Sequence, residues 1–353
     1  MFTLFTSGAR LADSFHAGVV GPLLAARLPG LRYSAGRLGA GSDVLGLDDP
    51  VSRDHDWGLR LAVLLDECDA AAVPAVLRVL GELGGSFGGH PVRFALTTDP
   101  EPRHRVQVAT ARDFAAGLLG PDPLGPLGAV DWLVLTGQSI LEVTAGPVFS
   151  DTATDLMRIR ERLRSYPPQV ELYVLASAWE SLGQALPLAG RAAGRGGRTQ
   201  WRILASGLCA TLTHLAFVLR GAWPPYPKWT EALFARIPGA ADLADPLAAL
   251  ASAPDWPAAE RAFAAAASIL LGWQRDRGLP APAHPVIPFF GRAYLGVEPA
   301  IAAGLRALVT DPEVLALPPG VGSLEQWTGH TAVLSSPGRR AALAAAYRTW
   351  SAP

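Results

Sequence analysis

The sequence predicts an α+β fold, in which a sheet with flanking helices is followed by a mostly α-helical part. Strand-like apolar runs occur early in the chain, at 57–65, 92–97 and 104–110. Beyond residue 128 almost every apolar run has helical spacing instead. The segment PDPLGPLG at 121–128 is rich in Pro and Gly, separates the two patterns and is the best candidate for a linker.

The chain of 353 residues is long enough for two ordinary domains. We expect an α/β domain over 1–120 and a helical domain over 121–353. Half of the residues are apolar and 17% are charged, which excludes disordered and fibrous classes. No repeat of about 20 to 50 residues is visible, so a solenoid is excluded as well.

The N-terminal part alternates between helical and strand-like patterns, with a glycine-rich turn between the first two strands. The prolines of TDPEP at 98–102 predict a reversal of the chain there rather than one continuous strand. The predicted elements are a helix over 9–28, a strand over 31–38, a turn over 39–42, a strand over 57–65, a helix over 70–83 and strands over 92–97 and 104–110.

The C-terminal part reads as a series of helices. Pro257 and Pro299 suit the first turn of a helix, where a missing N–H leaves no hydrogen bond unmade. The predicted helices cover 140–148, 154–165, 170–188, 198–221, 229–237, 257–273, 299–308 and 339–350.

Several features favour a cytoplasmic protein that does not bind a membrane. The longest uncharged run, 203–219, is just short of the roughly 18 to 20 residues that cross a bilayer, and a buried helix explains it better. Met1 to Arg10 lacks the pattern of a signal peptide. Cys68 and Cys209 lie far apart in the sequence and suggest neither a disulfide framework nor a zinc site, which fits a reducing compartment.

The charge balance differs mildly between the two parts of the chain. The net charge is -1, but residues 1–150 carry 11 arginines and 16 acidic residues, whereas residues 151–353 carry 19 basic and 15 acidic residues. This asymmetry is too weak for a nucleic-acid surface, so we expect no DNA partner. It would suit a cleft with metal-binding acids on one wall and anion-binding arginines on the other.

The residues with the clearest chemical pattern are Gly41-Ser42 and Asp54-His55-Asp56, which leads into the 57–65 run. On an extended strand, residues two apart project to the same side, so Asp54 and Asp56 can bind one cation or a pair of cations. Oxygen ligands of this kind suit Mg²⁺. Gly41 allows an anion to approach the backbone, and Ser42 offers a hydroxyl and an amide at an expected helix start. The pattern predicts a metal site beside a phosphate site.

This pattern resembles the DNA polymerase β-like nucleotidyltransferase superfamily, which has a Gly-Ser turn, a spacer and an Asp-x-Asp on the next strand. The strings GSDVLGLDDPVSRDHDWG, VTAGPVFSD and PPYPKW, which begin at residues 41, 143 and 224, are similar to a bacterial branch labelled DUF4037. The resemblance implies a nucleotidyltransferase-like mixed sheet. It also implies transfer of a nucleoside monophosphate from an NTP, with Mg²⁺ held by Asp54 and Asp56 and the triphosphate by Gly41 and Ser42.

One part of the superfamily pattern is missing. Active members usually have a third carboxylate on a later strand, which completes the metal site or takes the acceptor proton. The outward polar residue of the 104–110 strand is Gln107, which cannot act as a base. The sequence does not choose among the substitutes, which are Asp99, Glu101, His104, Asp131, Asp151 and Asp155.

Lys228 is the only lysine in the chain and lies in a turn rich in Pro and aromatic residues. A compact ammonium would suit contact with a phosphate of the nucleotide, and we therefore include Lys228 with Gly41 and Ser42 as a phosphate-binding residue. A helix-entry loop packed by tryptophans explains the same pattern equally well.

Four further groups have a structural interpretation as the default. His55 should form a structural hydrogen bond on the other side of the strand, and the acids between Gly41 and Asp54 should lie in a solvated loop. The arginine run on the 154–165 helix should form a solvated face, with anion binding as the alternative. The aromatic cluster after His284 should pack in the core, with a stacking surface for a ring as the alternative. The residues concerned are Asp43, Asp48, Asp49, Arg158, Arg160, Arg162, Arg164, Phe289, Phe290, Arg292 and Tyr294.

We interpret the sequence as a Mg²⁺-dependent nucleotidyltransferase that uses an NTP, with ATP expected, and a hydroxyl of a small-molecule acceptor. A tRNA end or a protein stays open as the acceptor. Two alternatives remain: a nucleotide-binding or sensory module without turnover, and a group transferase, for example an acyl transferase, that uses the same cleft. The signatures of serine hydrolases, zinc proteases, P-loop proteins and dinucleotide-binding proteins are missing from the sequence.

Overall fold

The computed structural model describes residues 5–350, and the chain divides into two compact units. The first unit comprises Met1–Leu127 with Gln138–Arg164, and the second comprises Gly128–Gly137 with Ser165–Pro353. Residues 1–4, on which the predicted lack of a signal peptide partly rests, lie outside the described residues. A short segment after the Pro- and Gly-rich stretch thus belongs to the second unit, and the chain then returns to the first.

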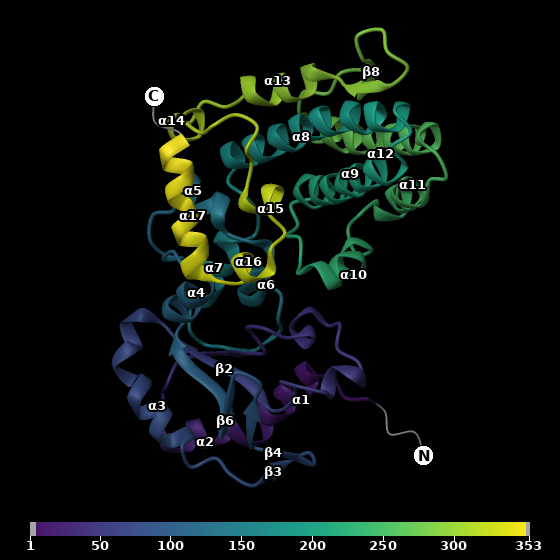
Figure 1. Ribbon diagram of the computed structural model, residues 1–353. Coiled ribbons are helices and arrows are strands. Elements are labelled where there is room, and N and C mark those ends of the chain that lie inside the picture. The colour runs from purple at the N-terminus through teal and green to yellow at the C-terminus, as the bar shows by residue number, and fades with distance from the viewer. Residues whose placement is uncertain (1–4, 351–353) are drawn as a thin grey trace. The chain divides into compact units, whose positions relative to one another are not determined.

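The first unit is built on a mixed five-stranded sheet with the strand order β5-β6-β2-β1-β7 (Figure 1). β2 is parallel to β6, and β1 is antiparallel to both β2 and β7. This mixed sheet, together with the predominance of helices elsewhere, confirms the predicted α+β class. The elements of this unit are α1 (Gly8–Phe15), η1 (His16–Val20), α2 (Gly21–Arg27), β1 (Ser34–Gly36), η2 (Ser42–Leu45), η3 (Val51–Arg53), β2 (Arg60–Leu65), η4 (Glu67–Ala72), α3 (Val73–Leu80), β3 (Ser86–Phe87), β4 (His90–Pro91), β5 (Arg93–Leu96), β6 (Asp99–Thr110), α4 (Ala111–Leu119), α6 (Gly137–Thr144), β7 (Val148–Asp151) and α7 (Asp155–Arg162).

The core of this unit forms where β2 packs against the first three helices. Leu61, Val63 and Leu65 share one face of the strand and are buried with Phe15 of α1 and Leu80 of α3. β2 carries apolar residues on its other face as well, and residues 61–65 are all buried. A central strand covered on both faces has this composition, which is why the apolar run was a reliable strand signal.

The predicted helix over 9–28 is continuous but contains a π-helical turn. The Gly21 N–H bonds to the His16 carbonyl, five residues earlier, and α2 begins there. Pro22 follows and has no N–H to continue the ordinary ladder, which accounts for the wider turn at this point.

The predicted reversal of the chain exists, but its predicted position at 98–102 is wrong. β6 is one continuous strand of 12 residues that includes Pro100 and Pro102, and the chain reverses earlier, between β5 and Asp99. β2 pairs with β6 only from Arg105 onward, so the stretch with the prolines has a partner on one side only. A proline is tolerated there because an edge position does not require every N–H.

The predicted helix over 140–148 is wrong at its C-terminal end. α6 ends at Thr144, and Val148 begins β7, which adds to the edge of the sheet beside β1. The sequence Gly146-Pro147 breaks the helix. A Cβ on Gly146 would lie 1.9 Å from the Arg37 carbonyl oxygen, so this close approach requires glycine.

The second unit is mainly helical (Figure 1). The long helices α8, α9 and α12 pack against one another and supply most of its buried residues. The elements are α5 (Ala129–Val134), α8 (Pro168–Gly194), α9 (Arg198–Leu219), η5 (Pro227–Trp229), α10 (Thr230–Phe234), α11 (Ala240–Ser252), α12 (Trp256–Asp276), β8 (Val286–Pro288), β9 (Leu295–Val297), α13 (Pro299–Ala307), α14 (Pro312–Leu315), α15 (Leu324–Trp327), α16 (Thr331–Leu334) and α17 (Pro337–Trp350).

Two helices of this unit, α11 and α9, need comment beside the sequence predictions. α11 was not predicted, because Pro246 lies inside it and its apolar spacing is weak. α9 contains the uncharged run at 203–219 and is the one helix among residues 5–350 that is long and apolar enough to cross a membrane, although 44% of its most apolar stretch is buried within the chain.

Candidate functional site

The Gly41-Ser42 turn is built around a buried ion pair between Arg37 and Asp43. Arg37 Nε donates to Asp43 Oδ2 over 2.6 Å, and Arg37 Nη2 donates to Oδ1 over 2.9 Å. The guanidinium also donates to two backbone carbonyls of the same turn, at 2.5 and 2.8 Å. Gly41 has a φ of 142°, and a Cβ there would lie 2.3 Å from Asp43 Oδ1. Both the backbone conformation and the space therefore require glycine at this position.

This ion pair corrects the expectation of a solvated acidic loop. Asp43 is buried and paired with Arg37. Asp48 is half-buried and accepts a hydrogen bond of 2.7 Å from the Gly8 N–H at the start of α1. Of the three acids, Asp49 alone is exposed as expected. The residues next to Asp43 in the sequence do not indicate that Arg37 is its partner, which is why the burial of this acid was not predicted.

Asp54 and Asp56 lie in the loop before β2 and not on an extended strand as expected. Asp54 follows η3 with helical backbone angles, and Asp56 has a φ of 53°. β2 begins four residues after Asp56, at Arg60. Asp tolerates the left-handed conformation better than most residues, but that conformation interrupts a strand. The alternation of side chains along a strand therefore does not determine how these two carboxylates point.

The two carboxylates each have one oxygen engaged by a neighbour. Asp56 Oδ1 accepts a hydrogen bond of 2.6 Å from the Thr97 N–H. Asp54 Oδ1 lies 2.7 Å from Nδ1 of His55, so this histidine forms a hydrogen bond as expected, but its partner is Asp54 itself and the pair lies in a loop rather than on opposite sides of a strand. Within residues 5–350 the second oxygen of each carboxylate has no hydrogen-bond partner. Free carboxylate oxygens are the donors that Mg²⁺ prefers, so these residues fit the implied metal.

The Gly-Ser turn and the Asp-x-Asp loop lie at the same edge of the sheet, where edge here means the side at which strands begin and end rather than an outer strand. The turn follows the C-terminal end of β1, and the loop enters the N-terminal end of β2, which is antiparallel to β1. Arg60 Nη1 donates to the Asp56 carbonyl oxygen over 2.9 Å, and its charge also interacts with Arg37 and Asp43. Burial, and then the nearby Arg37, lower the pKa of Arg60 to about 10, which leaves it charged at neutral pH. One guanidinium thus neighbours both motifs.

The topology excludes two of the acids that the sequence left open as a third carboxylate. Asp151 accepts a hydrogen bond of 2.5 Å from Ser34 Oγ, at the N-terminal end of β1. Asp155 bonds through its N–H to Asp66, which directly follows β2. Both acids therefore lie at the edge of the sheet opposite to Asp56. A six-residue strand such as β2 spans roughly 20 Å, so neither can share a metal with Asp56.

The other candidates for the third carboxylate or the base are Asp99, His104, Glu101 and Asp131, and their surroundings differ. Asp99 pairs with Arg105 over 2.7 Å, and this hydrogen bond lowers the pKa of the Asp99 carboxyl, which makes the carboxylate a weaker proton acceptor. His104 lies opposite Arg93 in the β5–β6 pair, and burial lowers the pKa of its ring. Glu101 is exposed on the same strand as Asp99 and has no ion-pair partner among the residues that the structure describes. Asp131 belongs to the second unit.

A carboxylate that the sequence analysis did not consider, Glu142, lies on α6 close to the Gly-Ser turn. Its carbonyl oxygen accepts a hydrogen bond of 2.7 Å from the Gly39 N–H, and its carboxylate accepts one of 3.1 Å from Gln138 Nε2. Its charge also interacts with Arg60. The signal that could have identified it is its position directly before the VTAGPVFSD string.

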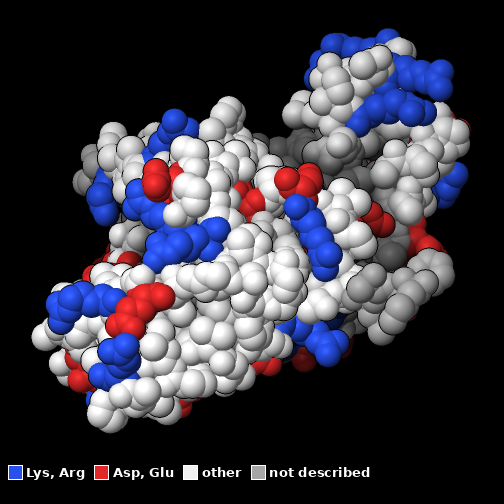
Figure 2. Space-filling model, turned by 90° about the horizontal axis from the view of Figure 1, so that it is seen from below, with Lys and Arg blue, Asp and Glu red and all other residues white. Residues whose placement is uncertain are grey.

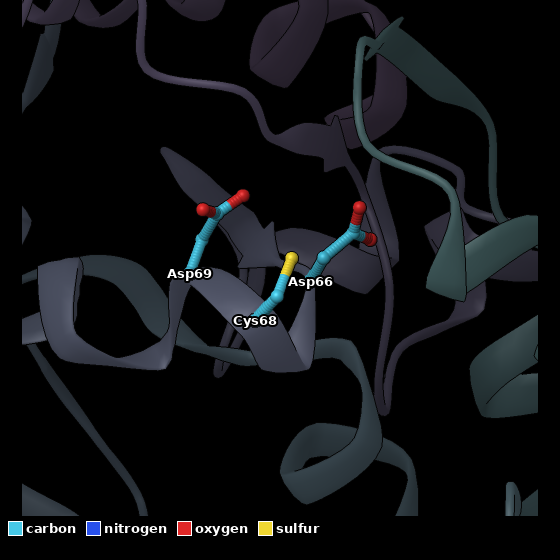
Figure 3. Close-up of side chains that lie close together, drawn as sticks. All are labelled: Asp66, Cys68 and Asp69. Carbon is cyan, nitrogen blue, oxygen red and sulfur yellow. The ribbon is translucent and has the colours of Figure 1, made fainter.

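Asp66, Cys68 and Asp69 form the one group of three or more possible metal ligands found among residues 5–350 (Figure 3). Their ligand atoms lie within 4.8 Å of one another, with the Cys68 sulfur between the two carboxylates. Arg32 Nη2 lies 3.1 Å from Asp69 Oδ2 and 3.7 Å from the sulfur. This group follows β2, at the opposite edge from Asp56, and the Arg32 guanidinium offsets part of the charge of its two carboxylates.

The carboxylate of Asp66 binds N–H groups at the start of α7, which leads to a prediction about stability. Its Oδ1 accepts hydrogen bonds of 2.8 Å from the N–H groups of Thr154 and Asp155, at the start of α7. Burial alone would raise the pKa of Asp66, but these bonds and Arg32 hold it below the ordinary value. We expect Asp66→Asn to lower the free energy of unfolding by about 1 kcal/mol at pH 7, because a negatively charged carboxylate interacts more favourably with the N-terminal end of a helix dipole than a neutral amide does.

The pH dependence follows from the direction of that pKa shift. A carboxyl with a lowered pKa in the folded state stabilises the fold above its unfolded pKa, and this contribution is lost as the pH falls through the folded value. The difference between wild type and Asp66→Asn should be constant above about pH 4 and shrink below it. Urea denaturation at pH 7 and pH 3 measures it, and an equal difference at both values would contradict the assignment.

Lys228 lies in η5 of the second unit, whereas Gly41 and Ser42 lie in the first. Its side chain is exposed, and Nζ lies 4.7 Å from the centroid of the Trp229 ring. The geometry matches the loop packed by a tryptophan, and the predicted contact with phosphate stays a prediction.

The arginine run of α7 is engaged within the first unit. Arg158 pairs with Asp155, and Arg164 pairs with Glu161. Arg160 is half-buried, and burial lowers its pKa; its guanidinium donates to the carbonyls of Val143 and Gly146. Arg162 likewise donates to two carbonyls of the 121–128 segment. The default of a solvated face is therefore wrong for these last two arginines, which tie α7 to neighbouring loops.

Comparisons with known proteins agree with the predicted resemblance over part of the chain. Residues 132–230 match the family model described as a domain of unknown function, DUF4037. This match confirms the predicted resemblance to DUF4037 over that segment, which includes VTAGPVFSD and PPYPKW but not Gly41, Ser42, Asp54 or Asp56. The crystal structure of a nucleotidyltransferase-like protein from Exiguobacterium sibiricum 255-15 is similar, with 13% identity, 74% of each chain covered and a TM-score of 0.33. No curated protein sequence matches the chain.

Proposed function

We propose that the first unit catalyses Mg²⁺-dependent transfer of a nucleoside monophosphate from an NTP, with ATP expected, to a hydroxyl of a small-molecule acceptor. The observation that supports this most directly is the shared sheet edge. A glycine turn and two aspartates reach that edge from adjacent antiparallel strands, β1 and β2. One guanidinium, Arg60, neighbours both motifs.

The residues of this edge would divide the work between metal and phosphate. Asp54 and Asp56 would hold Mg²⁺, which when bound neutralises charge on the α-phosphate. Gly41 and Ser42 would donate their N–H groups to the outer phosphates; within residues 5–350 these two N–H groups have no hydrogen-bond acceptor.

The proposed reaction is a substitution at the α-phosphorus of the NTP. The acceptor oxygen forms a bond to the α-phosphorus, the bond from that phosphorus to the bridging oxygen breaks, and pyrophosphate leaves. The acceptor proton passes to a carboxylate. Glu101 and Glu142 are the acids at or near this edge that could receive it.

Asp56 shows a sign of functional constraint. It is one of two non-glycine residues with positive φ among residues 5–350. A left-handed backbone at a non-glycine residue costs of the order of 1 kcal/mol, and such residues cluster at active sites. Its carboxylate is also fixed by the Thr97 N–H.

The surface charge favours a small acceptor over a nucleic acid. The net charge of the chain is -1. Over most of the face shown in Figure 2, charged side chains of both signs are interspersed among uncharged residues, and basic side chains gather only at its upper right. Nucleic-acid binding depends on many phosphate contacts from clustered Lys and Arg, so we favour a small molecule as acceptor.

The test combines a binding and a turnover measurement. ATP with Mg²⁺ should raise the thermal midpoint of the wild-type chain by at least about 2 °C, and omission of Mg²⁺ should abolish the shift. With a hydroxyl-bearing acceptor library, the wild type should release pyrophosphate. Absence of any shift with all four NTPs would reject nucleotide binding and the transferase together.

A nucleotide-binding module without turnover is the second candidate. Within residues 5–350, no group of three or more possible metal ligands includes Asp54 or Asp56, although active members of the superfamily usually have a third acid. A stabilising shift without pyrophosphate release from any acceptor would support this module. A shift with an activated acyl donor and none with NTPs would support a group transferase instead.

A further inference from the structure

The helical unit contains a cavity of about 580 Å³, and of the residues discussed above only Pro299 and the aromatic pair Phe289-Phe290 line it. Its walls come from α8, the β8–β9 hairpin, the start and middle of α13 and residues 319–320, all within the second unit. Figure 1 shows the hairpin beside α8 and next to α13. Small-molecule sites have volumes of about 300 to 1,000 Å³, so this cavity has a suitable size.

The mouth of the cavity carries an aromatic residue in an unfavourable state. Phe290 is 87% exposed and has a φ of 48°. Its ring meets that of Phe289 edge to face, with 4.8 Å between the centroids, and Phe289 in turn stacks on Tyr294 at 5.7 Å. The expectation that this cluster packs in the core is therefore wrong for Phe290. A strained, exposed aromatic ring at a cavity mouth points to contact with a molecule outside the chain.

The charged side chains of the wall are two carboxylates and one guanidinium. Arg306 forms an ion pair with Glu180. The Glu298 carboxylate accepts a hydrogen bond of 3.0 Å from the Ala300 N–H. The wall therefore has a net charge of -1. The faces of aromatic rings also attract cations, so the rings and the carboxylates favour the same sign of charge in a ligand.

We propose that this cavity binds a small organic cation that carries an apolar ring. The ring would contact Phe289 and Phe290, and the positive charge would face the carboxylates of Glu180 and Glu298. The same charges disfavour anions, so the cavity is unsuited to the triphosphate of an NTP. The proposal stands independently of the nucleotidyl transfer proposed for the first unit.

The first measurement compares two probes of similar size and opposite charge on the full chain. Benzyltrimethylammonium should bind with a Kd of the order of 1 mM, as expected for a ligand of about a dozen heavy atoms. Phenylacetate should bind at least tenfold more weakly. Ligand-observed saturation-transfer NMR measures both, and equal or stronger binding of phenylacetate would overturn the proposal.

Substitutions then localise the site. Gly183 lines the cavity on α8, and a Cβ there would lie 3.8 Å from Val297 Cβ, an ordinary contact. Gly183→Leu should fill the cavity and weaken benzyltrimethylammonium binding at least tenfold, and leucine favours a helix more than glycine does. Gly207→Leu is the matched control, because Gly207 is an exposed glycine of α9 with no atom within 4 Å of a Cβ.

A second variant removes a positive charge from the cavity wall and should strengthen, rather than weaken, the binding of a cation. Arg306→Gln removes the positive charge of the wall and leaves Glu180 available to the ligand, so binding of benzyltrimethylammonium should become at least threefold tighter. The side chain of Arg306 is about half exposed, at 45%, which limits the effect on folding. Unchanged or weaker binding in this variant, or wild-type binding in Gly183→Leu, would overturn the proposal.

Discussion

Asp56→Asn is expected to lower the rate of pyrophosphate release by at least about 10³-fold, because it removes a charged oxygen ligand of the metal. The variant should keep its fold. Asparagine retains an oxygen that can accept the hydrogen bond from Thr97, and it tolerates the positive φ of this position. Asp54→Asn should have a similar effect, since Asp54 supplies the other carboxylate. The measurement is pyrophosphate release at saturating ATP and Mg²⁺.

The matched control for these variants is Asp49→Asn, in the same segment. Asp49 is exposed, and its carboxylate bonds to Ser52, a contact that asparagine can keep through its side-chain oxygen. This variant should retain at least about half of the wild-type rate, as an exposed surface substitution usually has a small effect. If Asp56→Asn and Asp49→Asn had equal rates, the proposed role of Asp56 in metal binding would be wrong.

The elements of the first unit that could be predicted are those whose sequence pattern follows directly from local structure. The run at 57–65 is apolar because the central strand is buried on both faces. The spacing from Gly41-Ser42 to the Asp-x-Asp identified two segments that the antiparallel pairing of β1 and β2 brings to one sheet edge. The α+β class could therefore be predicted without knowledge of tertiary contacts.

The features that could not be predicted depend on partners far away in the sequence or on backbone strain. Nothing near Asp56 indicates that its backbone is left-handed, and the bend moves the start of β2 to Arg60. Glu142 comes to the Gly-Ser turn only through the position of α6 beside the segment that follows β1. In the helical unit, Phe290 looks like a core residue by composition, although it is exposed at a hairpin tip.

The buried Arg37–Asp43 pair carries the second large prediction. Asp43→Ala should lower the free energy of unfolding by about 3 to 5 kcal/mol, since it leaves a guanidinium buried without its counter-charge. Arg37 and Asp43 have side chains that are 1% and 5% exposed, so water cannot replace the lost partner. Because the turn carrying Gly41 is shaped by this pair, the variant should also lose the thermal shift caused by ATP and Mg²⁺. Urea denaturation and thermal melts measure the two effects.

An exposed ion pair of the same unit provides the control. Arg32 and Asp69 lie 3.1 Å apart, but their side chains are 53% and 35% exposed, so solvent screens the interaction. Asp69→Ala should therefore cost less than about 1 kcal/mol. The two variants remove the same kind of carboxylate from the same kind of partner and differ mainly in burial. Equal losses in both would mean that Asp43 does not anchor the Gly-Ser turn, because burial is the only reason for the larger effect.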